Sequence, residues 1–124
     1  MQKKRIILKV SGESFAKKGE FGIDSNELKT IAKEITDAKN EKIDLAIVVG
    51  GGNMIRGASL AKDTNMDQGT TDHMGMLGTV INGLALKEAI ESLGFSARLM
   101  SALEMPAIAE PYIRKRAKRH FEKD

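Results

Sequence analysis

The sequence predicts an α/β protein with a mainly parallel sheet, and three observations support this fold class. Two short segments, residues 5–10 and 44–49, are apolar and rich in β-branched side chains, as strands covered on both faces are. An amphipathic helical pattern lies between them. Each strand segment runs into a glycine turn, at residues 11–12 and 50–52. Strand, helix and strand in this order form a βαβ unit, with parallel strands and a right-handed connection.

The helix between the strands is predicted to begin with Ser25 as its cap and to end at Asn40. Its apolar face is made of Leu28, Ile31, Ala32, Ile35 and Ala38. Residues 13–24 precede it, and Gly19 and Gly22 indicate turns there, in a small hairpin or an irregular flap. We expect the helix to cover one face of the sheet.

The chain after the second glycine turn is predicted to pass through a polar connector at residues 62–71 into a long helix from about Asp72 to Leu93. Gly94 would end this helix at its C-cap. Its middle, Met74–Leu86, carries no charge and shows no clear polar face. A helix of this kind is expected to be buried all round, in the core or against another subunit.

The last part of the chain is predicted to hold a short strand, Phe95–Met100, and a basic helix, Ile113–Phe121. Pro106 and Pro111 bracket the connector before that helix. Residues 113–124 hold six Lys or Arg and two Asp or Glu, a net charge of +4, so the rest of this chain of net charge +3 carries −1. One apolar stripe on the helix consists of Ile113, Ala117 and Phe121. A solvated basic face is therefore favoured over a nucleic-acid patch.

Length and composition exclude several classes of protein. With 124 residues, the chain has the size of one domain, residues 1–124. It has no cysteine, which excludes disulfides, thiolate nucleophiles and cysteine-ligated metals. Its longest charge-free run falls short of the roughly 20 apolar residues that span a bilayer, and its N-terminus lacks a signal-peptide pattern. We expect a cytoplasmic protein with no membrane partner.

Candidate site residues gather at the two glycine turns. Ligands of parallel α/β sheets bind beyond the carboxyl ends of the strands, so residues 11–12 and 50–52 are expected to lie side by side. Successive N–H groups at such turns bind anions, and Lys9 and Arg56 add positive charge. The second turn lacks the Gly-Lys-Ser/Thr of a P-loop, and Ile55 stands where the dinucleotide fingerprint ends in glycine. A phosphate site and a tight turn that needs glycine both remain open.

Asp72 also has two interpretations. It can cap the long helix, as can Thr70 or Thr71, or its carboxylate can accept hydrogen bonds from ligand hydroxyls. His73 and His120 lack metal-ligating companions at suitable spacing, and they are interpreted as structural or solvent-facing. No metal-ligating residues are therefore predicted.

Four motifs follow one another along the chain: LKVSGE at residues 8–13, GEFGID at 19–24, VGGGNMIRG at 49–57 and TDHMGML at 71–77. In sequence, order and spacing they resemble the bacterial UMP (uridylate) kinases of the amino acid kinase family. Other amino acid kinases share the first and third motifs, whereas the second and fourth indicate the uridylate enzymes. The resemblance covers essentially the whole chain. It implies a three-layer αβα sandwich with a mainly parallel sheet.

The resemblance also implies an activity and site residues: ATP-dependent phosphorylation of UMP to UDP, in pyrimidine nucleotide biosynthesis. Mg²⁺ would come with ATP, without a dedicated protein site. Lys9 would be catalytic, and the ATP phosphates would be met by Lys9, Val10, Ser11, Gly12, Gly52 and Arg56. UMP would be held by Gly51 and Asp72. The residues matching a GTP-regulated region, with UTP as another effector, are Lys17, Lys18, Gly19, Glu20, Phe21 and Gly22.

Family members continue past the basic helix into a second half that holds the adenine pocket. The chain is therefore expected to be the N-terminal, UMP-side part of such an enzyme. The resemblance also implies a homohexamer, which is the usual assembly in the family. The alternative is a catalytically incomplete fragment that acts only as a UMP-binding or self-association module, using the helix face of Met74–Leu86. A third hypothesis, nucleic-acid binding by Arg114–Arg119, has less support.

Overall fold

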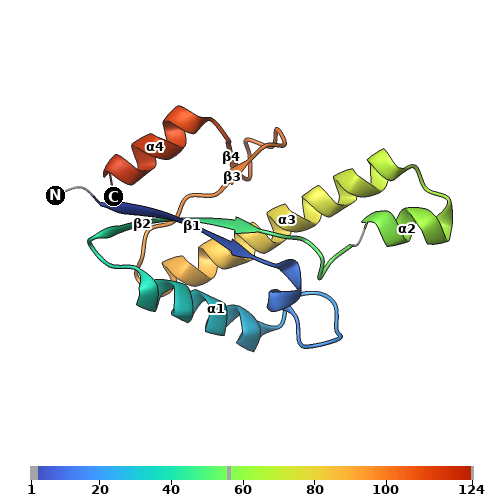
Figure 1. The fold of residues 1–124 in the computed structure, drawn as a ribbon, viewed down its shortest axis with the longest axis horizontal. Coiled ribbons are helices and arrows are strands. Elements are labelled where there is room, and N and C mark those ends of the chain that lie inside the picture. Colours follow the sequence, from blue (N-terminus) through green and yellow to red (C-terminus); the bar gives the residue numbers. More distant parts are fainter. Residues whose placement is uncertain (1–2, 56, 124) are drawn as a thin grey trace.

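A computed structural model describes residues 3–55 and 57–123, as a βαβ unit followed by three further helices. Figure 1 shows the elements in chain order. They are β1 (Lys4–Val10), the short 3₁₀ helix η1 (Gly12–Phe15), α1 (Ser25–Ala38), β2 (Ile43–Val49), α2 (Gly57–Thr64), α3 (Gln68–Glu91), β3 (Met100–Ser101), β4 (Glu110–Pro111) and α4 (Arg114–Lys123).

Strands β1 and β2 pair in parallel, which confirms the predicted βαβ unit. Their register places Lys9 opposite Val48 and Val10 opposite Val49, so both strands end at the same edge of the sheet. Helices α1 and α4 lie on opposite sides of the two strands (Figure 1). The predicted α/β fold with helix, sheet and helix layers is therefore confirmed.

The core lies on the α1 side of the sheet, around the fully buried Phe15 of η1. Helix α1 contributes Ala32 and Ile35 to it, and α3 contributes Leu86 and Ile90. The strands add Val10, Leu45, Ile47 and Val49. Alternate strand residues point to this face because side chains of a strand alternate between its two sides. The apolar periodicity of 25–40 was thus correctly assigned to a helix that covers the sheet.

The opposite face of the two strands is only partly covered. Near the start of β1, the guanidinium carbon of Arg5 lies 5.2 Å from the centre of the Phe121 ring of α4. Further along, Ile7 is 75% and Val48 is 53% exposed. The expectation that helices cover both faces of the second strand is therefore wrong for the described residues, because α4 reaches only one end of that face.

Two helix starts differ from the predictions. Asp24, not Ser25, caps α1, because its carboxylate accepts a hydrogen bond from the Glu27 N–H at 3.0 Å. Asp67 caps α3 by accepting from the Thr70 N–H at 3.2 Å. The predicted polar connector at residues 62–71 is consequently wrong, since it contains the end of α2 and the first turn of α3. The polar sequence hid both, because a carboxylate can cap a helix at whichever position reaches the free N–H groups.

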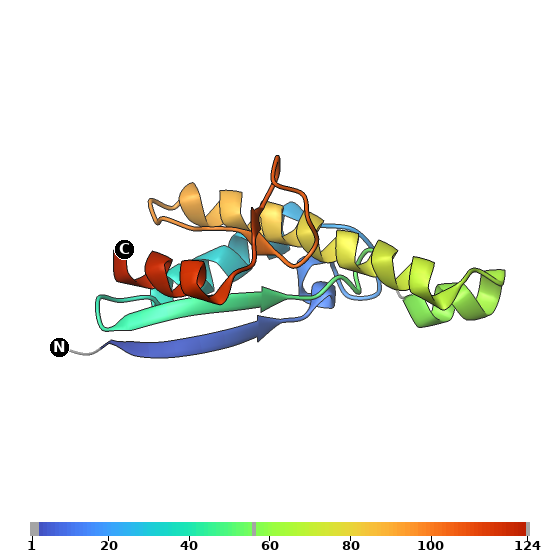
Figure 2. The ribbon, with the colours of Figure 1, turned by 90° about the horizontal axis from the view of Figure 1, so that it is seen from above.

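The long helix is less buried than predicted. Within its charge-free segment, the side chains of Met76, Leu77 and Ile81 are 40–48% exposed, so this segment is not buried all round. Figure 2 shows the cause: the N-terminal part of α3, together with α2, extends past the ends of the strands. None of the described helices is long and apolar enough to cross a membrane.

The segment after α3 also departs from the prediction. The helix ends at Glu91 with Ser92 as its C-cap, and Gly94 follows in the left-handed region with φ of +89°. Of the predicted strand 95–100 only Met100 is in a strand, and β3 pairs with β4 over two residues. A strand needs a partner along its length, and β4 offers one only at Glu110 and Pro111. The basic helix is confirmed as α4.

Candidate functional site

The two glycine turns meet at the carboxyl ends of β1 and β2, as predicted. A Cβ atom added to Gly12 would lie 2.9 Å from the carbonyl carbon of Gly51 and closer still to the backbone nitrogen of Gly52. One added to Gly50 would lie 3.1 Å from the Gly12 nitrogen. Gly12 is not one of the described glycines with a positive φ. Glycine is therefore needed here for close approach and not for backbone conformation. A tight turn that needs glycine for its backbone conformation therefore does not explain why the two turns pack so closely.

The first turn carries the predicted charged and hydroxyl groups. Lys9 is exposed near the end of β1, and Val10 accepts a hydrogen bond from the Gly50 N–H at 3.0 Å. Ser11 is exposed, and its hydroxyl oxygen lies 3.0 Å from that of Ser14. The end of β1 and the turn after it therefore provide one exposed lysine and one exposed hydroxyl.

Helix α3 forms the other side of the glycine loop. A Cβ added to Gly51 would lie 2.7 Å from the Gly75 carbonyl oxygen and 3.0 Å from the Thr79 nitrogen. Asp72 is three residues before Gly75 and seven before Thr79, so the three share one face of the helix. Asp72 is exposed, and its Oδ1 accepts from Gln68 Nε2 at 2.8 Å. Since Asp67 caps the helix, the capping interpretation of Asp72 is wrong.

Residues 17–22 form a loop around an open hollow next to the second turn. The hollow has a volume of about 650 Å³, and Lys17, Lys18, Phe21 and Gly52 are among its lining residues. Phe21 is 79% exposed, and Gly19 and Gly22 have positive φ, as their predicted turns require. Lys17 Nζ lies 3.8 Å from an Asp24 carboxylate oxygen, which ties the loop to the start of α1. Of the two alternatives left open, this is an irregular flap and not a hairpin.

The two histidines bond to residues outside the glycine turns. His73 is exposed and its Nδ1 is 2.8 Å from the Gly69 carbonyl oxygen. His120 Nε2 is 2.7 Å from Glu110 Oε2, and joins α4 to β4. The residues that the structure describes contain no group of three or more His, Cys, Asp or Glu placed to hold a metal ion. The predicted phosphate contact Arg56 lies outside the described residues.

Comparison with known proteins identifies the family. A model of the amino acid kinase family matches residues 4–123. The chain belongs to the amino acid kinase family.

Relatives within this family carry one activity in their names. The chain is 49% identical over 120 residues to the uridylate kinase of Rubrobacter xylanophilus, covering 97% of this chain and 47% of that protein. It is 51% identical over 120 residues to the uridylate kinase of Aliarcobacter butzleri, covering 97% of this chain and 51% of the relative. The chain thus spans about half the length of the curated relatives it matches.

Solved structures agree with the sequence relatives. The crystal structure of UMP kinase from Ureaplasma parvum matches with a TM-score of 0.90 and 35% identity, covering 99% of this chain and 52% of that one. UMP kinase from Bacillus anthracis matches with a TM-score of 0.91 and 37% identity, covering 99% of this chain and 50% of that one. The resemblance to bacterial UMP kinases and the fold of this amino acid kinase are therefore confirmed.

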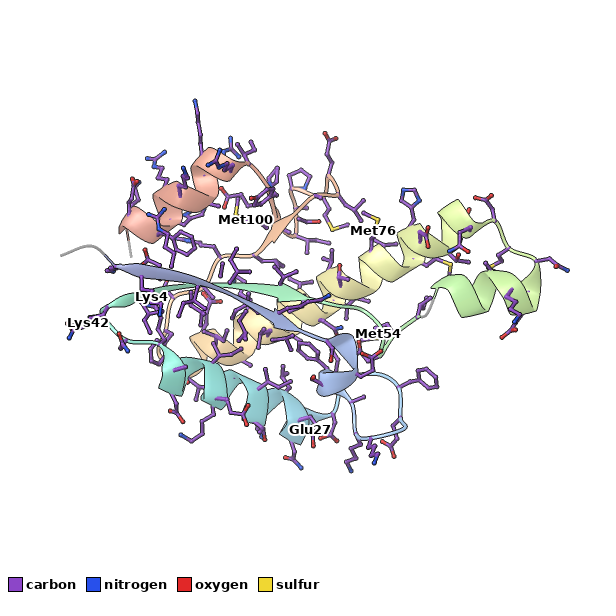
Figure 3. The ribbon with its side chains drawn as sticks, in the orientation of Figure 1. Lys4, Glu27, Lys42, Met54, Met76 and Met100 are labelled. Carbon is purple, nitrogen blue, oxygen red and sulfur yellow. The ribbon has the colours of Figure 1, made fainter. Side chains whose placement is uncertain are left out.

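Two residues of the site in this amino acid kinase were missed by the sequence reasoning. Asn53, at the end of the glycine loop, is 2% exposed, and Asn82 of α3 is fully buried. Their side chains hydrogen-bond to each other. Asn53 also donates to the Gly22 carbonyl, and Asn82 donates to the Gly50 carbonyl. Figure 3 places the neighbouring Met54 where the glycine loop approaches α3, and Met76 on the side of α3 away from α1. The sequence did contain a signal. Asn82 is the only side-chain amide in the charge-free segment Met74–Leu86, and buried amides need hydrogen-bond partners.

Proposed function

We propose that this chain provides the UMP-binding side and part of the phosphate site of an ATP-dependent UMP kinase, which converts UMP to UDP. The observation that carries the proposal is the contact of the Gly12 turn with the loop of residues 50–52 at the carboxyl ends of β1 and β2. That edge is where ligands of parallel α/β sheets bind. The names of the relatives and solved structures, uridylate kinase and UMP kinase, support the choice of substrate.

The chemistry asked of these residues is alignment and charge neutralisation. Phosphoryl transfer spreads negative charge over the transferred group, and enzymes stabilise it with cations and N–H donors. In the proposal, Lys9 contacts the phosphoryl group in transfer, and the backbone at Val10, Ser11, Gly12 and Gly52 binds the ATP phosphates. No general base is required, because the attacking oxygen of UMP is already anionic.

The nucleoside side of the proposed site lies along α3. Gly51 packs against this helix at Gly75 and Thr79, and Asp72 extends the same face toward the helix start. In the proposal, the Asp72 carboxylate accepts hydrogen bonds from the ribose hydroxyls of UMP. Gly51 lets the glycine loop approach the helix closely, because a side chain there would clash with the α3 backbone.

Magnesium fits the proposed reaction as an ion bound by ATP. Mg²⁺ prefers six oxygen ligands, keeps several waters, and often takes the remaining ligands from substrate phosphates. The described residues offer no acidic cluster that would replace these ligands. The ion would neutralise charge on the phosphates, while the residues of this chain position them.

Calorimetry on this chain tests the proposal. UMP should bind more tightly than CMP and AMP. Asp72→Ala should weaken UMP binding by about tenfold or more, because it removes hydrogen bonds to a charged group. Asp37→Ala, which removes an exposed carboxylate of α1, is the matched control and should leave UMP affinity unchanged. Equal or absent binding to a folded sample, or unchanged affinity in Asp72→Ala, would contradict the proposal.

Activity is best tested in a longer, active form of the protein. There, Lys9→Ala should lower kcat much more than it changes KM, because the lysine acts on charge that develops during transfer. A variant with a raised KM and an unchanged kcat would assign Lys9 to substrate binding alone.

Self-association is a second proposed property, and the exposed apolar residues of α3 favour it. Met76, Leu77 and Ile81 leave 40–48% of their surface in contact with solvent, and such clusters often mark interfaces. In the proposal they contribute to a homo-oligomer, a hexamer in the complete enzyme. Analytical ultracentrifugation should show concentration-dependent association that Ile81→Lys abolishes. A monomer at all concentrations would oppose this.

Regulation is proposed for the loop of residues 17–22. Lys17 and Lys18 line the hollow together with Glu20 and Phe21, and two cations suit a nucleotide effector such as GTP or UTP. Kinetics of the active enzyme with GTP should lose their response in Lys17→Ala, while the kcat without GTP stays the same.

A further inference from the structure

A pair of buried asparagines joins the glycine loop to α3 and to the loop of residues 17–22. Asn53 Nδ2 donates to Asn82 Oδ1 at 3.1 Å, and Asn82 Nδ2 donates to Asn53 Oδ1 at 2.6 Å. Each amide donates its second hydrogen to a carbonyl: Asn53 to Gly22 at 2.8 Å, and Asn82 to Gly50 at 2.8 Å. The two amides therefore use all four of their N–H hydrogens.

The orientation of both amides follows from these contacts. If either side chain were flipped, its oxygen would face the carbonyl oxygen of Gly22 or Gly50, and two acceptors would meet without a proton. The backbone adds a further bond, because the Gly22 N–H donates to the Asn53 carbonyl at 2.8 Å. Asn53 thus holds Gly22 through both its side chain and its main chain.

The pair also determines the direction of one N–H of the glycine loop, and a turn determines that of the next. The C=O and N–H of one trans peptide point in opposite directions, and the described residues contain no cis peptide. Since the Gly50 carbonyl points at Asn82 of α3, the N–H of Gly51 points away from that helix. The Gly51 carbonyl accepts from the Met54 N–H at 2.9 Å. The N–H of Gly52 belongs to the same peptide, so it points away from Met54.

We infer that Asn53 and Asn82 are positioning residues of the phosphate site: they hold the Gly50 carbonyl toward α3 so that the N–H of Gly51 faces the ligand, next to the Gly52 N–H that the following turn orients. The inference rests on the proposed function, since it assigns these donors to substrate phosphates. The same pair fixes the loop of residues 17–22 to the site through Gly22.

Asparagine suits this role better than its nearest alternatives. Leucine has a similar size but would leave the part-buried carbonyl of Gly22 or Gly50 without its side-chain donor. Aspartate would keep an acceptor for the partner amide but would set a second oxygen against those carbonyls. A reciprocal amide pair is satisfied only when both residues are present, so each loop depends on both side chains.

The first measurement needs no ligand. Amide hydrogen exchange of Gly22 and Met54, whose N–H groups donate into the glycine loop, should quicken by about tenfold in Asn82→Asp, because the loop loses a buried hydrogen bond. Asn53→Ser is the second variant. It leaves α3 intact, so it decides the question if Asn82→Asp does not fold by circular dichroism. Asn26→Asp, at an exposed position of α1, is the matched control and should exchange like the parent.

The second measurement uses tripolyphosphate and UMP as separate probes. In the parent, tripolyphosphate should shift the N–H resonances of Gly51 and Gly52. In Asn82→Asp and Asn53→Ser the Kd for tripolyphosphate should rise by about tenfold, and these shifts should shrink. A tenfold rise corresponds to the loss of about one hydrogen bond between the loop and the ligand. A merely structural role would lower the melting temperature without changing the resonance response of folded protein.

The outcomes separate the inference from the proposed function. A parent that binds tripolyphosphate through Gly51 and Gly52 but does not discriminate UMP from CMP and AMP overturns the proposed substrate and leaves the positioning role supported. Variants that are folded, exchange faster and bind tripolyphosphate like the parent overturn the positioning role. So does a parent in which tripolyphosphate leaves both glycine resonances unmoved.

Discussion

Replacing Gly12 with alanine should force apart the two turns of the proposed phosphate site. The new methyl group would lie 2.8 Å from Asn53 Oδ1, 2.9 Å from the Gly51 carbonyl carbon, and closer still to the Gly52 nitrogen. Two of these neighbours are backbone atoms, which cannot rotate away as a side chain would. Overpacking of this kind costs about 1–3 kcal/mol.

The net effect includes the unfolded chain. Exchange of glycine for alanine stabilises by about 0.4–1 kcal/mol through lower unfolded-state entropy. Because all three contacts are shorter than 3.0 Å, we take the upper end of the overpacking cost, about 3 kcal/mol, and subtract the entropy gain. Gly12→Ala should therefore lower the free energy of unfolding by roughly 2–2.6 kcal/mol. Gly75→Ala is the matched control: it lies inside α3 with nothing within 4 Å of its added Cβ. That variant should gain up to about 1 kcal/mol from helix propensity.

Urea denaturation followed by circular dichroism measures both variants, and calorimetry with UMP measures the site. Gly12→Ala should bind UMP more weakly than the parent, because the turns no longer meet, whereas Gly75→Ala should fold at least as stably as the parent. A Gly12→Ala protein as stable as the parent would show that the turns can separate without cost, and the close approach would no longer explain the glycine.

Three further predictions concern stability. Asp67→Ala should lower the free energy of unfolding by about 1 kcal/mol through loss of the α3 cap, whereas Asp72→Ala should leave it unchanged. Equal losses for the two variants in urea denaturation would contradict the assignment of Asp67 as the cap. Asp44→Asn should cost about 1 kcal/mol, because this 7% exposed carboxylate pairs with Lys3 and Arg5, whose exposure weakens the pairs; the loss should shrink at high salt. The hydrogen bond to Glu91 raises the pKa of Lys87 above its ordinary 10.5, so the contribution of this pair to stability is present at neutral pH and is lost as pH rises through the higher folded value. A ¹⁵N titration should show Lys87 deprotonating at lower pH in Glu91→Gln, and an unchanged titration would contradict the pairing.

Much of the fold could be predicted because it depends on local patterns. The strands β1 and β2 were located by their β-branched composition, and α1 by its apolar periodicity. The glycines after both strands located the edge of the site. These features repeat every two or every 3.6 residues, or require a single residue type, so they can be recognised in a short stretch of sequence.

Predictions failed where several residues compete for one role. Asp67, Thr70, Thr71 and Asp72 can all cap a helix, and only the position of the free N–H groups selects Asp67. The charge-free segment of α3 is compatible with complete or partial burial. Its exposure at Leu77 and Ile81 depends on how far the helix extends past the strands.

The sequence alone determined the parallel βαβ unit, the two glycine turns and the family to which they belong. Only the tertiary structure showed that Gly12 is needed for close approach, and that Asn53 and Asn82 pair across 29 positions of the chain. The physical reason is that local propensity acts through neighbouring residues, whereas a buried amide is stable only next to a donor and an acceptor that distant segments bring to it.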